Sequence, residues 1–195
     1  RAMLTVGWFC ALRSANLVAI RREHVRLIRR AEGELIDDIE KPDGLILHLP
    51  RSKTDQLGEG RDVAVVAQDD ETVCPVRALA TYFESVPFNT NDLIFPVSER
   101  TVSRLVKRFV SNAEHGHKTM REIEACTSCA DTARRFGSHS LRRGVETKMA
   151  QAGVGERRLM RHGGWKDERV ARGYMDDALL FENNPTEGLA AKRST

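Results

Sequence analysis

Hydrophobic residues dominate the start of the chain, and patterns of mixed polarity follow. Residues 3–12 (MLTVGWFCAL) are apolar enough to predict a helix that is buried on all sides. From Leu17 to Ile28 the apolar positions recur near the helical period, which predicts an amphipathic helix over residues 14–28 with Ser14 as its cap. We therefore expect the opening segment to be helical.

Short runs of β-branched and apolar residues follow between residues 34 and 66. The Pro-Asp-Gly sequence at 42–44 separates two such runs, which predicts an antiparallel hairpin. Residues 61–66 (RDVAVV) come after a polar loop and predict a third strand. The sequence thus predicts one small three-stranded antiparallel sheet.

Helical patterns return in the second half of the chain. Pro75 predicts the first turn of a helix that reaches about Phe83, because proline is tolerated in that turn. Ser98 and Ser138 are candidate caps of later helices, and Gly153 is a candidate stop. Further helices are predicted at 99–113, within 115–135, from 139 onward, at 156–162 and at 167–174. The fold class is therefore α+β, mostly α-helical with a small three-stranded sheet, and no linker divides the chain.

Composition narrows the class of protein. Of the 195 residues, 41% are hydrophobic and 30% are charged, as in ordinary globular proteins. No apolar run approaches the roughly 20 residues that span a bilayer, and no signal-peptide pattern is found. The four cysteines are too few for a disulfide framework, and Cys10 lies in an apolar run typical of a core position. We expect an intracellular protein.

Positive charge is concentrated toward the C-terminal end. The net charge is only +3, but residues 139–172 contain nine basic and four acidic side chains. A partner that carries phosphates would explain this excess, and a solvated helix surface would explain it equally well.

Three side chains in this basic region, and a fourth two residues after it, have the chemistry of a phosphate site. His139 and Arg142 are three residues apart on a predicted helix, so they share a face with Cβ atoms roughly 5–6 Å apart. A guanidinium matches two phosphate oxygens, and an imidazole beside it can transfer a proton. Trp165 offers an N–H donor, and Tyr174 offers a phenol that nearby cations could activate. Each residue alone also fits an ordinary structural role, in a solvated helix start or in the core.

The order of the motifs is more specific than any one of them. They are, in order, LRSAN with Arg13, RSKTD with Lys53, HSLRRG with His139 and Arg142, GGW with Trp165, and finally Tyr174. This series resembles the tyrosine recombinase (phage integrase) family, and its Cre-like branch in particular. The resemblance covers the chain up to about Asp177 and implies the tyrosine recombinase catalytic-domain fold.

The resemblance also implies a reaction, in which DNA strands are cleaved and rejoined through a 3′-phosphotyrosine intermediate. No metal, ATP or other cofactor takes part. The resemblance implies that Arg13 and Arg142 clamp the two non-bridging oxygens, that Tyr174 is the nucleophile and that Lys53 donates a proton to the leaving 5′ oxygen. It further implies that His139 takes the nucleophile's proton or steadies the phosphate, and that Trp165 donates a hydrogen bond to a non-bridging oxygen. The implied partners are double-stranded DNA and further copies of the chain, as a tetramer on DNA, with no membrane.

Two features depart from the family's pattern. Asn16 stands three residues after Arg13, where the family usually has Glu or Asp, so the electrostatics of the site should differ. The family's N-terminal DNA-clamping domain does not precede these motifs here, and we expect residues 1–195 to be a fragment that holds the catalytic domain. The C-terminal tail at 178–195 either docks on a neighbouring protomer or packs on its own domain.

His115, His117, Cys126 and Cys129 form H-x-H and C-x-x-C patterns, which are compatible with a zinc site. The C-x-x-C lies within REIEACTSCADTARRF, which predicts one helix without turn-forming residues around the cysteines. We therefore favour surface polar residues and packed thiols, and expect no metal.

Three functions fit the motifs. The first is a site-specific DNA recombinase or integrase. The second is a type IB topoisomerase-like enzyme, which uses the same kind of residues. The third is a DNA-binding module that keeps the fold and has lost cleavage.

Overall fold

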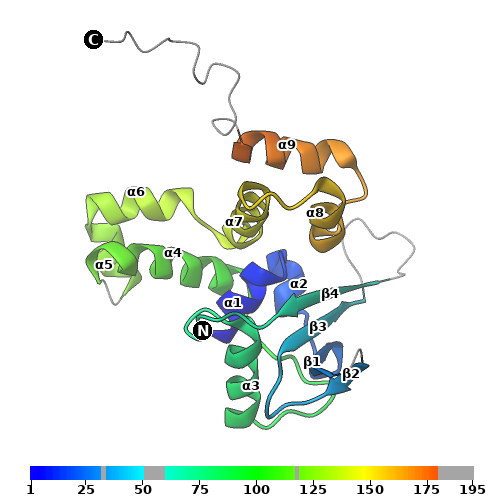
Figure 1. The fold of residues 1–195 in the computed structure, drawn as a ribbon. Helices are drawn as coiled ribbons and strands as arrows, with labels where there is room; N and C mark the ends of the chain where they lie inside the picture. The colour runs from blue at the N-terminus through cyan, green and yellow to red at the C-terminus, as the bar shows by residue number, and fades with distance from the viewer. Residues whose placement is uncertain (32–33, 51–59, 117–118, 180–195) are drawn as a thin grey trace, which may run out of the picture.

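A computed structural model describes residues 1–31, 34–50, 60–116 and 119–179, with the backbone alone at 112–114, 174 and 177–179 (Figure 1). In chain order the elements are α1 (Ala2–Phe9), α2 (Ser14–Val18), the 3-10 helix η1 (Arg22–His24), β1 (Val25–Ala31), β2 (Glu34–Asp37), β3 (Gly44–Leu49), β4 (Arg61–Val66), α3 (Pro75–Ser85), α4 (Glu99–His115), α5 (Met120–Ala125), α6 (Thr127–Arg135), α7 (Ser138–Gln151), α8 (Glu156–Gly163) and α9 (Glu168–Leu179). The mostly helical α+β class is confirmed. None of the described helices combines the length and the apolar character needed to cross a membrane.

The described strands form a four-stranded antiparallel sheet in the order β2-β1-β3-β4, so the prediction of three strands is wrong. The additional strand is β1, which was expected to belong to a helix. Val25 and Leu27 are buried and Arg26 between them is exposed, which is the alternation of a strand. Over so short a segment the apolar residues fit the period of a helix as well as that of a strand. The segment forms a strand because it pairs with β2 on one side and with β3 on the other.

The predicted hairpin at 42–44 is also wrong, because β2 and β3 lie on opposite sides of β1. Asp43 is bound to β1 instead. Its N–H donates to the Ile28 carbonyl at 2.9 Å, and its carboxylate accepts from the Arg30 N–H at 3.1 Å. The Pro-Asp-Gly sequence therefore directs the chain past β1 and into β3, while β4 pairs with β3 as a further antiparallel strand.

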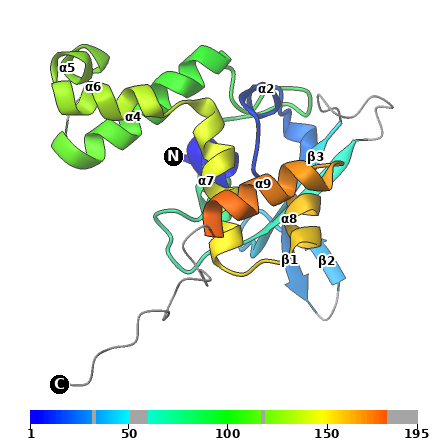
Figure 2. The same ribbon diagram turned by 90° about the horizontal axis from the view of Figure 1, so that it is seen from above.

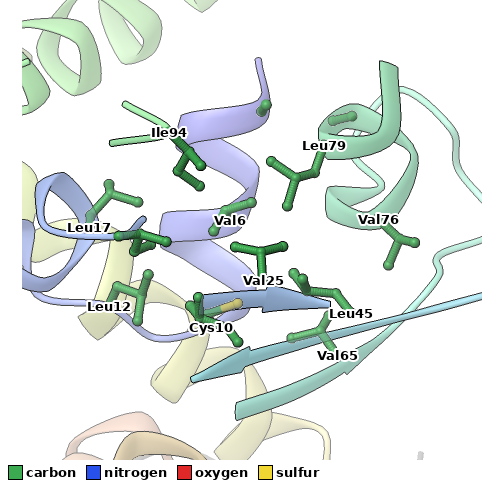
Figure 3. Close-up of a cluster of buried hydrophobic side chains, with 14 of the residues drawn as sticks. Val6, Cys10, Leu12, Leu17, Val25, Leu45, Val65, Val76, Leu79 and Ile94 are labelled. Atoms are coloured by element: carbon green, nitrogen blue, oxygen red, sulfur yellow. The ribbon is translucent and has the colours of Figure 1, made fainter. Parts of the chain in front are cut away.

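The main core forms where α1 lies against the sheet and α3 (Figure 3). α1 is apolar around its whole circumference, which suits a helix covered on several sides. Val6 and Cys10 are buried here beside Leu45 and Leu79. Burial raises the pKa of the Cys10 thiol to about 12, which confirms this cysteine as a core residue.

Several helix boundaries are as predicted. Pro75 is the first residue of α3, the Ser98 hydroxyl accepts from the Thr101 N–H at 3.2 Å, and Gly153 follows α7 with φ of 73°. The region 115–135 contains two helices where one was predicted, because the chain is extended at Cys126.

The start of α7 is one residue earlier than predicted. Ser138 is its first helical residue and not its cap; the cap position is Gly137, whose N–H donates to the Ser140 hydroxyl at 3.0 Å.

Gly144 in α7 gives a test of the contact between α1 and α7. A Cβ at Gly144 would lie 2.3 Å from Trp8 Cζ3, so the indole ring fills the place of a side chain. Alanine normally stabilises a helix interior relative to glycine by about 1 kcal/mol. We expect Gly144→Ala to lower the free energy of unfolding by about 1–3 kcal/mol instead, because the ring must move.

Gly173→Ala is the matched control, since no described atom lies within 4 Å of the added methyl group. It should leave the stability unchanged or raise it. Chemical denaturation of both variants measures the difference, and a Gly144→Ala protein as stable as the parent would show that the ring is not packed as described.

Candidate active site

The turn between α1 and α2 positions Arg13. Ala11 has φ of 50°, the left-handed region that costs a residue with a Cβ about 1–2 kcal/mol. Two hydrogen bonds hold this conformation: the Leu12 N–H donates to Gly7 O and the Ala11 N–H donates to Trp8 O, each at 3.0 Å. Together they form a Schellman motif that ends α1 abruptly. The turn places Arg13 at the N-cap of α2 and directs the Ala11 carbonyl toward α7.

Arg142 lies on α7 at the centre of the candidate site, and it is 2% exposed. Its Nη1 donates to the Ala11 carbonyl at 3.0 Å, and its Nη2 donates to the Gly163 carbonyl at 2.7 Å. Its Nε lies 2.9 Å from Glu146 Oε1 in an ion pair, and its Cζ lies 5.0 Å from the centre of the Trp165 ring. One guanidinium thus connects the α1–α2 turn, α7 and the end of α8.

Glu146 is a component of this site that the sequence analysis missed. It is 1% exposed, and no described residue donates a well-oriented hydrogen bond to either carboxylate oxygen. Burial raises the pKa of Glu146 to about 7, against the opposing effect of Arg142, Arg13 and Arg61. The available signal was its spacing, because a residue four positions after Arg142 lies on the same face of α7.

His139 is exposed in the first turn of α7. Its pKa is lowered by partial desolvation and by the positive charges of Arg142, Arg13 and Arg143. The imidazole is therefore neutral at neutral pH, so it can accept a proton. The electrostatic effect of Arg13 on both His139 and Glu146 shows that these groups share one environment.

The Gly163-Gly164 pair is explained by two different contacts. A Cβ on Gly163 would lie 3.0 Å from the Trp165 ring and 3.2 Å from Glu146 Oε1, so glycine allows α8 to approach α7 closely. Gly164 has φ of 69° and ends α8 in the left-handed conformation. A Cβ there would lie 2.4 Å from Arg61 Nε. The pair thus positions the Trp165 indole beside Arg142.

Arg61 and His162 connect the end of α8 to β4 and α1. The sequence did not indicate a role for either residue. Arg61 begins β4, and its Nη1 donates to the His162 carbonyl at 2.9 Å, near the negative end of the α8 dipole. His162 Nε2 lies 2.7 Å from Phe9 O, and it must carry the proton because a carbonyl can only accept. Burial lowers the pKa of His162, which favours this neutral form. These contacts join β4 and α1 to the end of α8.

Four of the six predicted site residues therefore lie in one region: Arg13, His139, Arg142 and Trp165. Lys53 lies outside the described residues. Tyr174 is described by its backbone alone, within α9, and its phenol lies outside the described part. α9 packs across α7 and α8, next to the elements that carry the other residues (Figure 2).

Three of the four candidate zinc ligands also lie together, although the sequence analysis did not favour a zinc site. The donor atoms of His115, Cys126 and Cys129 are within 4.8 Å of one another. His117 lies outside the described residues. This cluster is at the far end of α4 from the start of α7, so it is separate from the candidate active site (Figure 1).

Comparison with known proteins shows a likeness to recombinases. No protein-family model matches the chain. A curated protein named integrase/recombinase xerD homolog, from Selenomonas ruminantium, is 25% identical to it over 198 aligned positions, which cover 94% of this chain and 49% of that protein. The chain thus spans about half the length of this relative.

Solved structures agree on the fold. The XerH site-specific recombinase bound to difH substrate before cleavage has a TM-score of 0.56 at 16% identity, over 89% of this chain and 41% of XerH. The XerA recombinase has a TM-score of 0.55 at 19% identity, over 92% of this chain and 54% of XerA. The chain has the fold of the tyrosine recombinase catalytic domain. Its placement in the Cre-like branch stays a prediction.

The XerH complex after cleavage of palindromic difH has a TM-score of 0.59 at 14% identity, over 92% of this chain and 42% of XerH. The recombinase fold thus accounts for nearly the whole described chain, from α1 to α9. In this chain the buried carboxylate beside Arg142 is that of Glu146 on α7, and position 16 on α2 is asparagine.

The raised pKa of Glu146 predicts a pH-dependent stability. Between about pH 4.5 and 7 the folded state keeps the proton and the unfolded state has lost it, so stability falls as pH rises through this window. We expect Glu146→Gln, whose amide does not ionise, to lack this contribution. From pH 5 to 8 the wild type should lose up to about 3 kcal/mol relative to the variant, at about 1.4 kcal/mol per pKa unit.

Urea denaturation of both proteins at several pH values measures this difference. The variant also loses part of its attraction to Arg142, which changes its stability at every pH. The decisive quantity is therefore the slope of the stability difference against pH. A stability difference that stays constant or changes in favour of the wild type with rising pH would contradict the assignment.

Proposed function

We propose that the chain is the catalytic domain of a site-specific DNA recombinase or integrase that cleaves and rejoins strands through a 3′-phosphotyrosine. The observation that supports it is the gathering of Arg13, His139, Arg142 and Trp165 beneath α9, the helix that includes Tyr174. The relative named above is called an integrase/recombinase, and the XerH structures contain DNA substrates.

In the proposed reaction the Tyr174 oxygen attacks the phosphorus of one phosphodiester. An O–P bond forms to Tyr174 and the bond from phosphorus to the 5′ oxygen breaks. His139, whose pKa is lowered by partial desolvation and by its cationic neighbours, accepts the phenol proton, and Lys53 donates a proton to the leaving 5′ oxygen. The reverse reaction with another 5′-hydroxyl rejoins the strand, so the phosphodiester energy is conserved and no ATP is consumed.

The two arginines have different surroundings, and this suggests different contributions. Arg13 is half-buried at the start of α2, where it can approach a bound phosphate. Arg142 is held by two carbonyls and a carboxylate, so its charge has a fixed orientation before DNA binds. Fixed charges stabilise a transition state without reorganisation, and the pentavalent phosphorus carries more negative charge than the substrate. Trp165 keeps the Arg142 plane in place and is proposed to donate its N–H to a non-bridging oxygen.

The active form is proposed to be a homo-oligomer on double-stranded DNA. The tail at 178–195, which we propose docks on a neighbouring protomer, lies beyond the described residues except at Ala178 and Leu179.

A covalent adduct tests the proposed chemistry. The chain is incubated with a pool of nicked duplexes of randomised sequence, in which cleavage releases a short strand and traps the phosphotyrosine. We expect a protein–DNA adduct that resists denaturant, disappears in Tyr174→Phe and survives in Tyr82→Phe. Tyr82 is the matched control because its hydroxyl donates to Ile94 O in the core at 2.9 Å.

The outcomes separate the three functions. Adducts enriched in particular sequences support a site-specific recombinase, whereas adducts on all sequences, with relaxation of supercoiled plasmid, indicate a topoisomerase-like enzyme. DNA binding without an adduct indicates a module that has lost cleavage. An adduct that persists in Tyr174→Phe would contradict the assignment of the nucleophile.

The exposed face of α4 is a proposed DNA contact. Arg100, Arg104 and Arg108 recur every four residues, so they line one face of the helix, and all three are exposed. Within the described part of the chain none of them forms an ion pair. α4 packs against α2 and α7, which carry Arg13 and His139. This face could therefore hold the phosphates on one side of the cleavage site.

Binding to non-specific duplex DNA at several salt concentrations tests this contact without knowledge of the target site. We expect Arg104→Gln to weaken binding and to reduce the slope of log K against log salt by about 1, because one phosphate contact is lost. Arg77→Gln is the matched control, since Arg77 on α3 pairs with Glu71 at 3.2 Å. Equal effects of both changes would argue against a specific role for α4.

A further inference from the structure

The strongest chemistry outside the candidate active site is at the junction of α4, α5 and α6. His115 is the last residue of α4, Cys126 is the N-cap of α6, and Cys129 lies in the first turn of α6. His115 Nδ1 lies 2.9 Å from Cys129 Sγ and 3.6 Å from Cys126 Sγ. Three donors of the type that zinc prefers, one imidazole and two thiols, therefore converge from two segments of the chain.

The spacing of these atoms is close to that of ligands on a tetrahedral ion. Zn–S bonds of about 2.3 Å and Zn–N bonds of about 2.0–2.1 Å place neighbouring ligand atoms roughly 3.6–3.8 Å apart. The distance from His115 to Cys126 already has this value. The distance from His115 Nδ1 to Cys129 Sγ is shorter, so these two atoms would move apart by about 0.7 Å when an ion binds.

The backbone around the cysteines also suits a metal site. The backbone at Cys126 is extended, with φ of −93° and ψ of 113°, and this residue separates α5 from α6. The C-x-x-C pattern therefore spans a bend and the first turn of a helix, where both Sγ atoms can face one side. The first-turn N–H groups and the positive end of the helix dipole favour thiolate ligands there. The sequence predicts one continuous helix through both cysteines, without this bend, and for that reason it did not favour zinc.

The small size of the local core gives such an ion a structural purpose. α5 lies at the end of α4 and α6 runs back along α4, on the part of the molecule away from the sheet (Figure 1). In this unit the buried residues are Ile123, Cys129 and Ala133, with Met120 and Cys126 packed against them. Helices of six and nine residues are not stable by themselves in water, and this cluster buries little apolar surface to hold them.

We propose that His115, Cys126 and Cys129 bind one zinc ion, which fastens the α5–α6 unit to the end of α4. Cys129 is buried, Cys126 is half-buried and His115 is exposed, so the ion would lie at the edge of the unit. The role is structural: binding of the ion contributes to the folding of these two helices. This site is independent of the proposed recombinase chemistry, which needs no metal.

Zinc content tests the proposal directly. The full chain is purified without an affinity tag, in a reductant and without chelator, dialysed against micromolar zinc and then against buffer, and analysed by mass spectrometry. We expect about one zinc ion per chain. Cys126→Ser and Cys129→Ser should fall below about one tenth of an equivalent, and His115→Gln should bind at least about tenfold more weakly.

His48→Gln and Cys74→Ser are the matched controls, because His48 pairs with Asp62 on the sheet and Cys74 lies in the main core. Both should keep the full equivalent. Since Cys129→Ser removes a core atom, cobalt substitution of the wild type provides a second measure: thiolate-to-cobalt charge-transfer bands should appear, and should weaken in Cys126→Ser.

Limited proteolysis reports the structural role. Removal of the ion by a chelator should accelerate cleavage within 116–135 at least about tenfold relative to cleavage elsewhere, because the two helices lose their attachment. A wild type without stoichiometric zinc, or zinc that is retained in both cysteine variants, would overturn the proposal. Tyr174-dependent adduct formation could fail while zinc binds, and the reverse, so the two proposals are tested separately.

Discussion

The architecture of the candidate site depends on the burial of one guanidinium. Arg142 is enclosed by the Ala11 carbonyl, the Gly163 carbonyl and the Glu146 carboxylate. A buried cation is tolerated only when such partners are present, and removal of one partner from a buried pair typically costs about 3–5 kcal/mol. The α1–α2 turn, α7 and the end of α8 must therefore adopt their positions together, and the segment that carries Arg13 is positioned by the same contact.

The same cluster determines the electrostatics of the site. Arg142 and Arg13 lie close enough to lower the pKa of Arg61, and all three arginines act on the carboxyl of Glu146, the one carboxylate that enters this cluster among the described residues. The balance is positive, which suits a phosphate ligand, and it adds to the partial desolvation that lowers the pKa of His139. Burial raises the pKa of Glu146, so this group is protonated at low pH. Its negative charge then no longer offsets the positive charge of the arginines.

How far the sequence could predict this structure differs between local and distant features. Pro75, Ser98 and Gly153 act on the backbone within one turn, and the helix boundaries that they predict are confirmed. β1 was mistaken for a helix because its period is ambiguous over seven residues, and only its pairing with β2 and β3 decides the matter. The motif order correctly indicated that Arg13, His139, Arg142 and Trp165 come together, while their catalytic roles stay a proposal.

The sequence by itself determined which side chains are candidates for chemistry, where several helices begin, and the fold class, because these depend on residue type and short spacing. Tertiary structure decided how those side chains are held. Arg142 and Ala11 are 131 positions apart, and His162 and Phe9 are 153 apart, so no local pattern records these contacts. The buried state of Glu146, the attachment of Arg61 to α8 and the convergence of His115 with two cysteines arise only when the helices pack. Packing sets the desolvation and the charge neighbours of each group, and these determine what an ionisable side chain can do.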